Sequence, residues 1–322
     1  MARPRIVVLG SLNMDLVCYV PHHPLPGETL TANHFATSPG GKGANQAVAC
    51  GKLSRPSSSA SSSSSDATAD VAMIGAVGAD PHGTQLLDSL RAHGVDTAHV
   101  RSLDDAKTGV ALIVVDEPSG QNRIVLSPEA NHALLPEHVA QAIPGPRPDL
   151  LIMQLEVPLE TVLQALRTAR DAAIPVLLNP APARELPVDA YKGLAHLVVN
   201  ETEAAILSGC DESELDTAEG LKRVSGIFLE RGVRNVIITL GGRGVYYATH
   251  DGKSALVDAL KANVVDTTAA GDTFVGSYAL AVVSSTGTFD IDAAIRAANK
   301  AAAITVSRRG AQVSIPWKDE LQ

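Results

Sequence analysis

The residues best suited to chemistry lie in the segment Asp266–Phe274 (DTTAAGDTF), which leads into an apolar helical run. A helix that begins after such small residues points unsatisfied backbone N–H groups outward, and its macrodipole adds partial positive charge. We therefore predict an anion hole at Ala269, Ala270 and Gly271, with Asp272 beside it as a general base for a substrate hydroxyl during phosphoryl transfer. The alternative is that Asp272 only caps the helix, although a cap does not require three small residues before it.

A second stretch, Pro39–Ala49 (PGGKGANQAVA), places three glycines before a helix-prone run. Glycines let the backbone approach a ligand closely, and the helix that follows would aim N–H groups at it. The stretch is not a Walker A loop, because that pattern requires Gly and Ser or Thr where this chain has Ala36 and Gly43. The alternative is a glycine-rich turn that caps a helix, but such a turn needs neither Lys42 nor Asn45.

Three polar residues lie at or beyond the ends of predicted strands. Asn13 and Asp15 alternate after the first strand, so both side chains point to one side and could hydrogen-bond adjacent sugar hydroxyls. Glu156 follows a later strand in the same way. For each of the three, simple exposure to solvent is the alternative explanation.

Two further segments also follow predicted strands. Thr239–Val245 (TLGGRGV) has glycines where open α/β sheets bind nucleotides, although a hairpin turn would contain them as well. In Asn200–Glu203, the Glu203 carboxylate would face the same crevice and could hold hydrated Mg²⁺. The alternative there is an ordinary helix start, in which Asn200 is the cap and Glu203 completes a capping box.

The composition argues against several functional classes. The chain has 322 residues, a net charge of −9 and 3% aromatic residues, which disfavours nucleic acid as a partner. Three dispersed cysteines and ten histidines without ligand spacing predict neither a disulfide framework nor a metal site made by protein side chains alone. No apolar run is long enough for a signal peptide or a membrane span. We expect a soluble protein of the cytoplasm, with the nucleus as a second compartment and no membrane partner.

The elements that must position these residues alternate between strands and helices. Short β-branched runs predict strands at 5–10, 71–77, 109–116, 123–127, 149–154, 175–179, 196–200 and 235–240. Helical patterns follow several of them: one helix is expected from Thr84 until Gly94, and another opens at Pro158. This alternation predicts an α/β fold with a mainly parallel sheet flanked by helices.

Two regions interrupt the alternation. Strands predicted within about 13–38 and 107–127 have no helices between them, which indicates a small separate sheet that could serve as a lid or a dimer clasp. Segment 54–70 begins with a serine-rich tract, and we expect a flexible surface insertion without a catalytic role. The remainder of 1–322 is predicted to form a single α/β domain.

Taken together, these stretches resemble the ribokinase-like (PfkB-type) carbohydrate kinases, from about Ile6 to Trp317. The segments that carry the resemblance are Gly10–Asp15, Pro26–Thr29, Gly40–Ala49, Met153–Glu156, Asn179–Pro187, Asn200–Glu203, Asp266–Phe274 and Gly310–Gln312. The runs GGKGANQ and NPAPAR are the most specific of them. The resemblance implies a Rossmann-like domain with a small β-sheet lid, and ATP-dependent phosphorylation of D-ribose at its 5-hydroxyl.

The resemblance also implies the binding residues. The sugar would contact Asn13, Met14, Asp15, Gly41, Lys42, Gly43, Ala44, Asn45, Glu156 and Asp272. ATP would contact Asn200, Thr239, Leu240, Gly241, Gly242, Arg243, Gly244, Gly271, Asp272 and Asn299. Asn299 stands where the family often has a histidine against adenine. Mg²⁺ would be held through water near Glu203, and a monovalent cation, usually K⁺, by Asp266, Thr268, Thr305, Arg308, Gly310 and Ser314.

The resemblance leaves other functions open. A deoxyribokinase, a fructokinase or an adenosine kinase would share the fold, and ribose differs from 2-deoxyribose by a single hydroxyl. A catalytically silent sugar sensor on the same scaffold is an alternative from a different class. A homodimer through the lid strands is the expected assembly, because pairing there would cover exposed strand edges.

Overall fold

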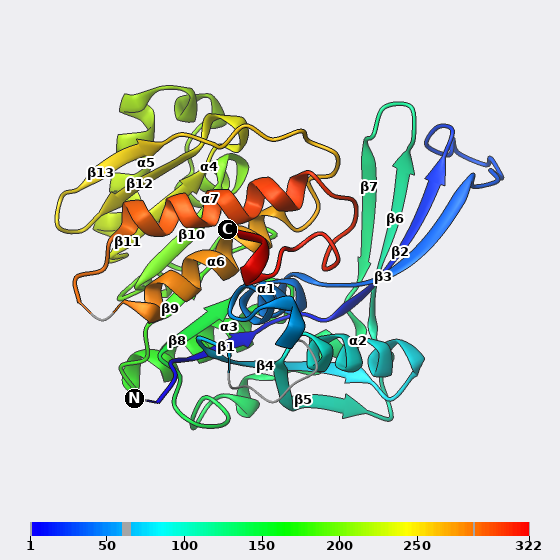
Figure 1. Cartoon of the computed structure of the whole chain (residues 1–322), viewed down its shortest axis with the longest axis horizontal. Coiled ribbons are helices and arrows are strands. Elements are labelled where there is room, and N and C mark those ends of the chain that lie inside the picture. Colours follow the sequence, from blue (N-terminus) through cyan, green and yellow to red (C-terminus); the bar gives the residue numbers. More distant parts are fainter. Residues whose placement is uncertain (1, 60–65, 286, 322) are drawn as a thin grey trace.

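The computed structural model describes residues 2–59, 66–285 and 287–321, and its largest element is a nine-stranded sheet (Figure 1). The strand order is β13-β12-β11-β10-β9-β8-β1-β4-β5. The strands β5, β4, β1, β8, β9, β10 and β11 run parallel to one another, and β12 is antiparallel to both of its neighbours, β11 and β13. Their bounds are β1 Arg5–Leu9, β4 Asp70–Gly78, β5 Val95–Leu103, β8 Leu150–Met153, β9 Val176–Leu178, β10 His196–Asn200, β11 Asn235–Thr239, β12 Val245–Thr249 and β13 Ser254–Val257.

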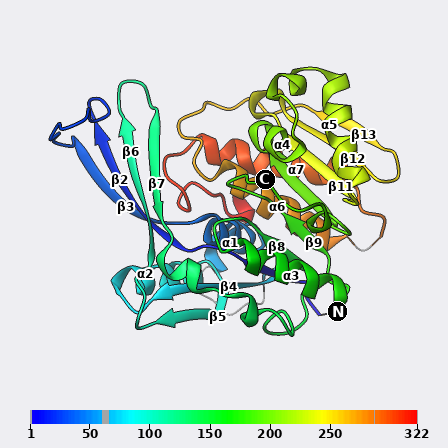
Figure 2. The ribbon, with the colours of Figure 1, turned by 180° about the vertical axis from the view of Figure 1, so that it is seen from behind.

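Alternate side chains of each buried strand pack into two separate apolar cores, one on each face of the sheet. In β1, Val7 and Leu9 belong to one core, whereas Ile6 and Val8 belong to the other. The first core contains α3 (Leu159–Asp171), α4 (Glu201–Ser208) and α5 (Ala218–Glu230). The second contains α1 (Lys42–Leu53), α2 (Pro81–Ala92), α6 (Ala270–Ser284) and α7 (Ile291–Val306). Helices therefore cover both faces of the sheet (Figures 1 and 2), as an apolar run in a parallel strand requires.

A second sheet of four strands stands beside this core. Its order is β3-β2-β6-β7, and it consists of β2 (Asn13–Val20), β3 (His34–Gly40), β6 (Gly109–Asp116) and β7 (Asn122–Ser127). Both views show it extending away from the helices (Figures 1 and 2). The predicted fold class, a mainly parallel α/β sheet with a small separate sheet, is confirmed.

The serine-rich segment 54–70 is more ordered at its ends than expected. Residues 60–65 lie outside the described residues, but Ser54 is buried and its hydroxyl donates to the Gly51 carbonyl at 2.8 Å. The backbone N–H and the hydroxyl of Ser57 both donate to Asp319. At the other end Ala69 is buried, and β4 begins at Asp70. The packed structure thus extends into both ends of the predicted insertion.

The chain order of the strands reverses beside β1, since β4 and β5 lie on one side of it and β8 to β11 on the other. Ligands of open α/β sheets bind outside the carboxyl ends of the strands at such a switch point. The residues that follow β1, β8, β10 and β11 are those singled out above, so the topology brings them to one edge of the sheet.

Candidate functional site

Two glycines let the start of α1 press against the end of β1. Gly41 precedes the helix with φ of +87°, and a Cβ there would lie 2.7 Å from the backbone nitrogen of Asn13. A Cβ on Gly43 would lie 2.6 Å from the carbonyl carbon of Gly10. Larger residues cannot occupy these positions without moving the backbone. The predicted glycine stretch is therefore more than a helix cap, because it sets α1 directly on the switch point.

The first turn of α6 leaves hydrogen-bond donors open. Ala269 is the N-cap, with a left-handed φ of 60° and no side-chain capping bond. In the described part of the chain, the backbone N–H groups of Gly271 and Asp272 have no hydrogen-bond acceptor, whereas the Ala270 N–H, which was predicted to belong to the anion hole, donates to the Thr267 carbonyl at 3.2 Å. A Cβ added to Gly271 would meet no atom within 4 Å. Open donors facing free space at a helix N-terminus are the arrangement that binds anions.

Asp272 does not cap α6, so the alternative interpretation of this residue is wrong. Its side chain is 8% exposed and accepts two hydrogen bonds from consecutive residues of α1. Asn45 Nδ2 donates to Oδ2 at 3.1 Å, and Gln46 Nε2 donates to Oδ1 at 3.0 Å. Both donors are amides, which suits an ionised carboxylate that can only accept. Asp272 is thus held at the open end of α6 with a fixed orientation.

Close approach of α1 and α6 makes this geometry possible. Gly276, one turn after Asp272, faces Ala49 of α1, and a Cβ at Gly276 would lie 2.5 Å from the Ala49 side chain. The two helices therefore meet where neither has a bulky residue. Asn45, one turn before Ala49, can consequently reach the carboxylate.

A cluster of charges surrounds the start of α1. Burial, together with the carboxylates of Glu156 and Asp272, raises the pKa of Asp15 to about 7. Burial alone would lower the pKa of the Lys42 ammonium, but Asp272, Glu156 and Glu203 outweigh it and the pKa is raised. Lys42 is therefore a cation among carboxylates.

Two of the three residues expected at strand ends are buried. Asn13 and Asp15 are buried at the base of β2, which contradicts the solvent-exposed alternative for them, and Asn13 Oδ1 accepts from Asn131 Nδ2 at 2.8 Å. Glu156 is partly buried, and its Oε2 accepts from the Ser11 hydroxyl at 2.5 Å and from the Lys42 N–H at 3.0 Å. These contacts bring the predicted sugar-side polar groups to one place.

Met14 and Ala44 differ from the other residues predicted to contact the sugar. Both side chains are buried in the apolar core that α1 and α6 share, so they pack rather than face a ligand. Their neighbours Asn13, Asp15 and Asn45 point the other way because successive residues of a strand, and residues one apart on a helix, face different sides.

A cavity of about 490 Å³ opens beside the first turn of α6. Six of the residues predicted to bind the nucleotide line it, namely Thr239, Gly241, Gly242, Gly244, Gly271 and Asn299. Val245, Thr267, Ala270 and Phe274 of the two predicted segments also line it. The remaining wall was not predicted: it comes from the irregular segment 259–264 and from α7, with Ala302, Ala303 and Val306. Asn299 Nδ2 donates to the Asp258 carbonyl at 3.2 Å, which ties α7 to that segment.

The other four predicted residues, Asp272, Leu240, Arg243 and Asn200, do not line this cavity, although Asp272 directly follows the lining residue Gly271. Leu240 is buried in the core, and the Arg243 guanidinium points away to form ion pairs with Glu201 and Asp216. It also donates to the Leu215 carbonyl at 3.0 Å. The predicted contact of Leu240, Arg243 and Asn200 with ATP is therefore not matched by the lining of this cavity.

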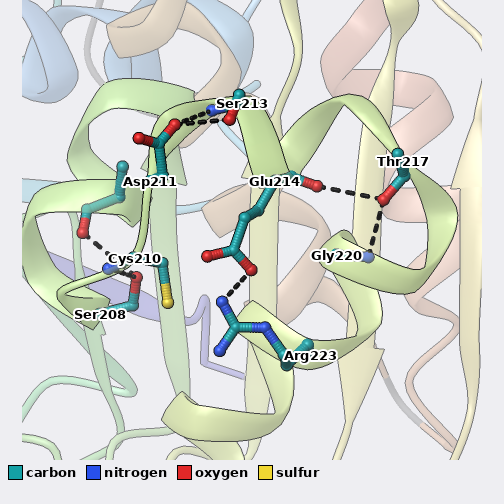
Figure 3. Close-up of polar contacts among 9 residues, drawn as sticks. Ser208, Cys210, Asp211, Ser213, Glu214, Thr217, Gly220 and Arg223 are labelled. Carbon is teal, nitrogen blue, oxygen red and sulfur yellow. Dashed lines mark hydrogen bonds and ion pairs between the residues drawn. The ribbon is translucent and has the colours of Figure 1, made fainter.

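Arg243 instead fastens the glycine loop to the turn Glu212–Asp216, labelled η5. Figure 3 shows how this turn is held at both ends, with the Asp211 carboxylate accepting from Ser213 and the Thr217 hydroxyl accepting from the Gly220 N–H. Glu214 pairs with Arg223 of α5 in the same view. The glycine loop is therefore bound, through Arg243, to a turn that its own hydrogen bonds and ion pair hold in place.

Asn200 and Glu203 form the reciprocal capping box that was the alternative interpretation. Asn200 Oδ1 accepts from the Glu203 N–H at 2.8 Å, and Glu203 Oε2 accepts from the Asn200 N–H at 3.0 Å. Burial raises the pKa of Glu203, and Asp272 adds to the effect while Lys42 opposes it. The second carboxylate oxygen, Oε1, takes no part in the box. It is a hard oxygen of the type that suits Mg²⁺, so the residue fits that role.

The residues expected around a monovalent cation are only partly brought together. Asp266 Oδ1 accepts from the N–H and the hydroxyl of Thr268, and Asp266 Oδ2 accepts from the Gly310 N–H at 2.8 Å. This joins the loop before α6 to the loop after α7, and its carbonyl, hydroxyl and carboxylate oxygens fit a hard cation. Thr305 lies deeper and donates to Thr273, while the Arg308 side chain pairs with Glu320 and the Ser314 hydroxyl donates to Ala311.

Several polar residues of the site were missed by the sequence analysis. Gln46 Nε2 also donates to Asn179 Oδ1 at 2.9 Å, and Gln154 Nε2 donates to Gln46 Oε1 at 2.6 Å. Ser11 and Asn131 orient Glu156 and Asn13, respectively. Gln46, Gln154 and Asn179 all stand inside the segments that carry the family resemblance, which is the signal that could have identified them.

The described residues contain neither a cluster of metal-ligating side chains nor a membrane-spanning helix. No group of three or more His, Cys, Asp or Glu side chains in this part of the chain is arranged to hold a metal ion. None of the helices formed by these residues is long and apolar enough to cross a membrane.

Comparison with known proteins adds independent information. Residues 3–318 match the pfkB family of carbohydrate kinases. The ribokinase of Schizosaccharomyces pombe is 44% identical over 97% of this chain and 94% of its own length, and that of Haemophilus influenzae is 38% identical over 99% and 97%. The structure of Arabidopsis thaliana ribokinase complexed with ribose and ATP superposes with a TM-score of 0.84, at 28% identity over 99% of this chain and 98% of the other.

Proposed function

The chain belongs to the pfkB family of carbohydrate kinases, and we propose that it is an ATP-dependent ribokinase, which converts D-ribose and ATP to D-ribose 5-phosphate and ADP. The observation that carries the proposal is the position of Asp272. It lies at the open N-terminus of α6, between the cavity lined by the glycine loop and the polar cluster at the start of α1. A base in that position can serve a hydroxyl on one side and a phosphate on the other.

The proposed reaction assigns a role to each of these groups. Asp272 takes the proton of the 5-hydroxyl as O5 attacks the γ-phosphorus, and the bond from that phosphorus to the leaving ADP oxygen breaks in line. The free N–H groups of Gly271 and Asp272 stabilise the negative charge on the transferred group. Asn13 and Asp15 hold the other hydroxyls of the sugar, and Lys42 balances the charge of the surrounding carboxylates.

Two metal ions belong to the proposal. Mg²⁺, which shields the phosphates of ATP when bound, would be held through water at Glu203 Oε1. K⁺ would be held by oxygen atoms of the paired loops around Asp266, Thr268 and Gly310. Both ion sites are proposed because Mg²⁺ and K⁺ prefer oxygen ligands of the kind that these residues supply.

We further propose that the small sheet closes over the sugar and pairs with its counterpart in a homodimer. The strand β2 begins at the sugar-side residues Asn13 and Asp15, so a movement of this sheet would reach them directly. The assignment to the cytoplasm stays part of the proposal, and the unpaired Cys18, Cys50 and Cys210 agree with a reducing compartment.

The deciding experiment is a coupled assay of ADP release with a panel of pentoses, hexoses and nucleosides, each with and without K⁺. We expect D-ribose to give the highest kcat/KM, and replacing K⁺ with Na⁺ to lower the rate. A higher kcat/KM for 2-deoxyribose, fructose or adenosine would overturn the substrate assignment. Absence of ADP release with every acceptor would instead favour a sugar sensor.

A further inference from the structure

Gln312 is a buried amide that belongs to neither ligand site. Its side chain is 3% exposed and lies between α1 and α2. Gln312 Nε2 donates to Asn45 Oδ1 at 3.2 Å, and Gln312 Oε1 accepts from the Ser89 hydroxyl at 2.9 Å. The donor and the acceptor of this amide each have a partner, and a reversed orientation would set two acceptor oxygens, Gln312 Oε1 and Asn45 Oδ1, against each other.

The amide of Asn45 is fixed from both sides as a result. Its oxygen accepts from Gln312, and its nitrogen donates to Asp272 Oδ2 at 3.1 Å. Without the Gln312 donor, the Asn45 amide oxygen loses this partner and the amide is held only through its bond to the carboxylate. One of the two hydrogen bonds that orient Asp272 would then come from a side chain that can rotate, and it would fix the carboxylate less firmly.

The segment that carries Gln312 is itself firmly attached. Lys52 of α1 is buried, and its ammonium donates to the Gln312 carbonyl at 3.2 Å while lying 5.2 Å from the centre of the Trp317 ring. Gly310, two residues earlier, donates its N–H to Asp266 at 2.8 Å. A side chain on such a support can hold its partner within the few tenths of an ångström that a catalytic group requires.

We propose that Gln312 is a positioning residue: it acts through Asn45 to set the orientation of the Asp272 carboxylate. This inference rests on the proposed kinase function, in which Asp272 is the general base. Gln312 does not contact the substrates. Its loss therefore disturbs the transfer step more than the binding of either substrate, and kcat falls while KM changes little.

The test is the variant Gln312→Met, which keeps the size of the side chain and removes its hydrogen bonds. We expect kcat to fall about tenfold, with KM for D-ribose and for ATP within about threefold. Thr161→Val is the matched control, because Thr161 is also buried and donates to Leu134 at 2.6 Å, remote from Asp272 in the other core. It should lower the midpoint of thermal unfolding to a similar degree and leave kcat unchanged.

A double-mutant cycle separates positioning from a general loss of packing. In the background of Asn45→Ala, the additional change Gln312→Met should alter kcat less than about twofold, because the partner through which it acts is gone. An equal factor in both backgrounds would overturn the proposal, and so would a kcat within twofold of the wild type in the single variant. If Gln312→Met does not fold, Ser89→Ala loosens the same amide from its other end and should also lower kcat.

A crystal structure of Gln312→Met provides a readout that does not depend on turnover. The Asp272 carboxylate should be rotated or present in more than one orientation, and an unchanged carboxylate would contradict the proposal. This outcome is separate from the failure of the proposed function, which would be seen as absence of phosphoryl transfer by the wild-type chain.

Discussion

At the scale of single residues, Asp272 combines three properties that suit the proposed role of general base: a fixed orientation, a place next to the cavity-lining Gly271, and oxygens that accept hydrogen bonds from the protein. Asp272→Asn preserves the shape and removes the base. We expect kcat to fall by about 10²- to 10⁴-fold, since that is the usual contribution of general base catalysis. Steady-state kinetics and a thermal unfolding curve test this together, and a kcat within tenfold of the wild type in a folded variant would refute the assignment.

Asp15 makes the stability of the chain depend on pH. Burial and the nearby carboxylates raise its pKa from 3.8 to about 7, so between these values the folded chain keeps a proton that the unfolded chain has released. Its contribution to the free energy of unfolding therefore falls as the pH rises from about 4 to about 7, by at most about 1.4 kcal/mol per pH unit, and stays low above that. Urea unfolding across this range should show a shallower decline for Asp15→Asn than for the wild type.

A control variant makes the pH experiment specific. Asp105 is exposed, and Asp105→Asn should follow the pH dependence of the wild type. If Asp15→Asn and the wild type also declined in parallel, the buried carboxyl would not be the source of the effect.

At the scale of elements, the contact between α1 and α6 links packing to catalysis. Gly276→Ala would place a Cβ 2.5 Å from the Ala49 side chain, so α6 must move away from α1 and carry Asp272 away from Asn45 and Gln46. We expect a loss of about 1–3 kcal/mol in the free energy of unfolding, as for other overpacked contacts, together with a lower kcat. Chemical denaturation and steady-state kinetics on the same preparation measure both.

The matched control for this substitution is Gly226→Ala in α5, where an added Cβ would meet no atom within 4 Å. Alanine is the better helix former, so the variant should be stabilised by up to about 1 kcal/mol with unchanged kcat. If Gly276→Ala behaved like Gly226→Ala, close packing of the two helices would not be what places Asp272.

The sequence predicts those elements whose patterns are local. The strands β6 and β10 have the predicted bounds, because both are short β-branched runs bounded by turns. The helix α2 begins at Pro81, three residues earlier than predicted, because Asp80 caps it through the Gly83 N–H. The strand β5 was missed: it is an edge strand with charged and exposed residues, so it lacks the apolar signal of the buried strands.

The site was predictable as a set of motifs but not as a set of contacts. Asn45 and Asp272 both stood out in the sequence, yet their hydrogen bond joins positions 227 residues apart, and no local spacing encodes it. The cavity wall at Ala259–Val264 is irregular and has no periodic pattern to recognise. Arg243 stood out with the glycines around it, whereas its partners on α4 and η5 were not visible from the loop itself.

At the scale of the whole molecule, an acidic chain has to bind a polyanion. A net charge of −9 repels ATP on average, so attraction must be local. Because the pKa of Lys42 is raised, its ammonium stays charged to a higher pH than an ordinary lysine does. The open N–H groups of α6 add hydrogen-bond donors that do not depend on pH. One local cation and a set of backbone donors can therefore attract phosphate although the protein surface is not basic.

The small sheet exposes apolar side chains that a monomer would leave in water. Leu112 pairs with Val125 across β6 and β7, so their side chains share a face, and the register through β2 places Phe35 on the same face. They are 47%, 63% and 54% exposed. A second copy of the sheet would cover these residues and a strand edge together.

Leu112→Lys should therefore weaken the proposed homodimer, because a charge buried between two apolar faces is unfavourable. In sedimentation velocity at micromolar concentration, we expect a dimer for the wild type and a monomer for this variant. Val188→Lys is the matched control: Val188 is 63% exposed in a short turn of the α/β core, and the change should leave the dimer intact. A wild-type chain that sediments only as a monomer would show that the apolar face of the small sheet has another role, and closure over the sugar would then have to occur within one subunit.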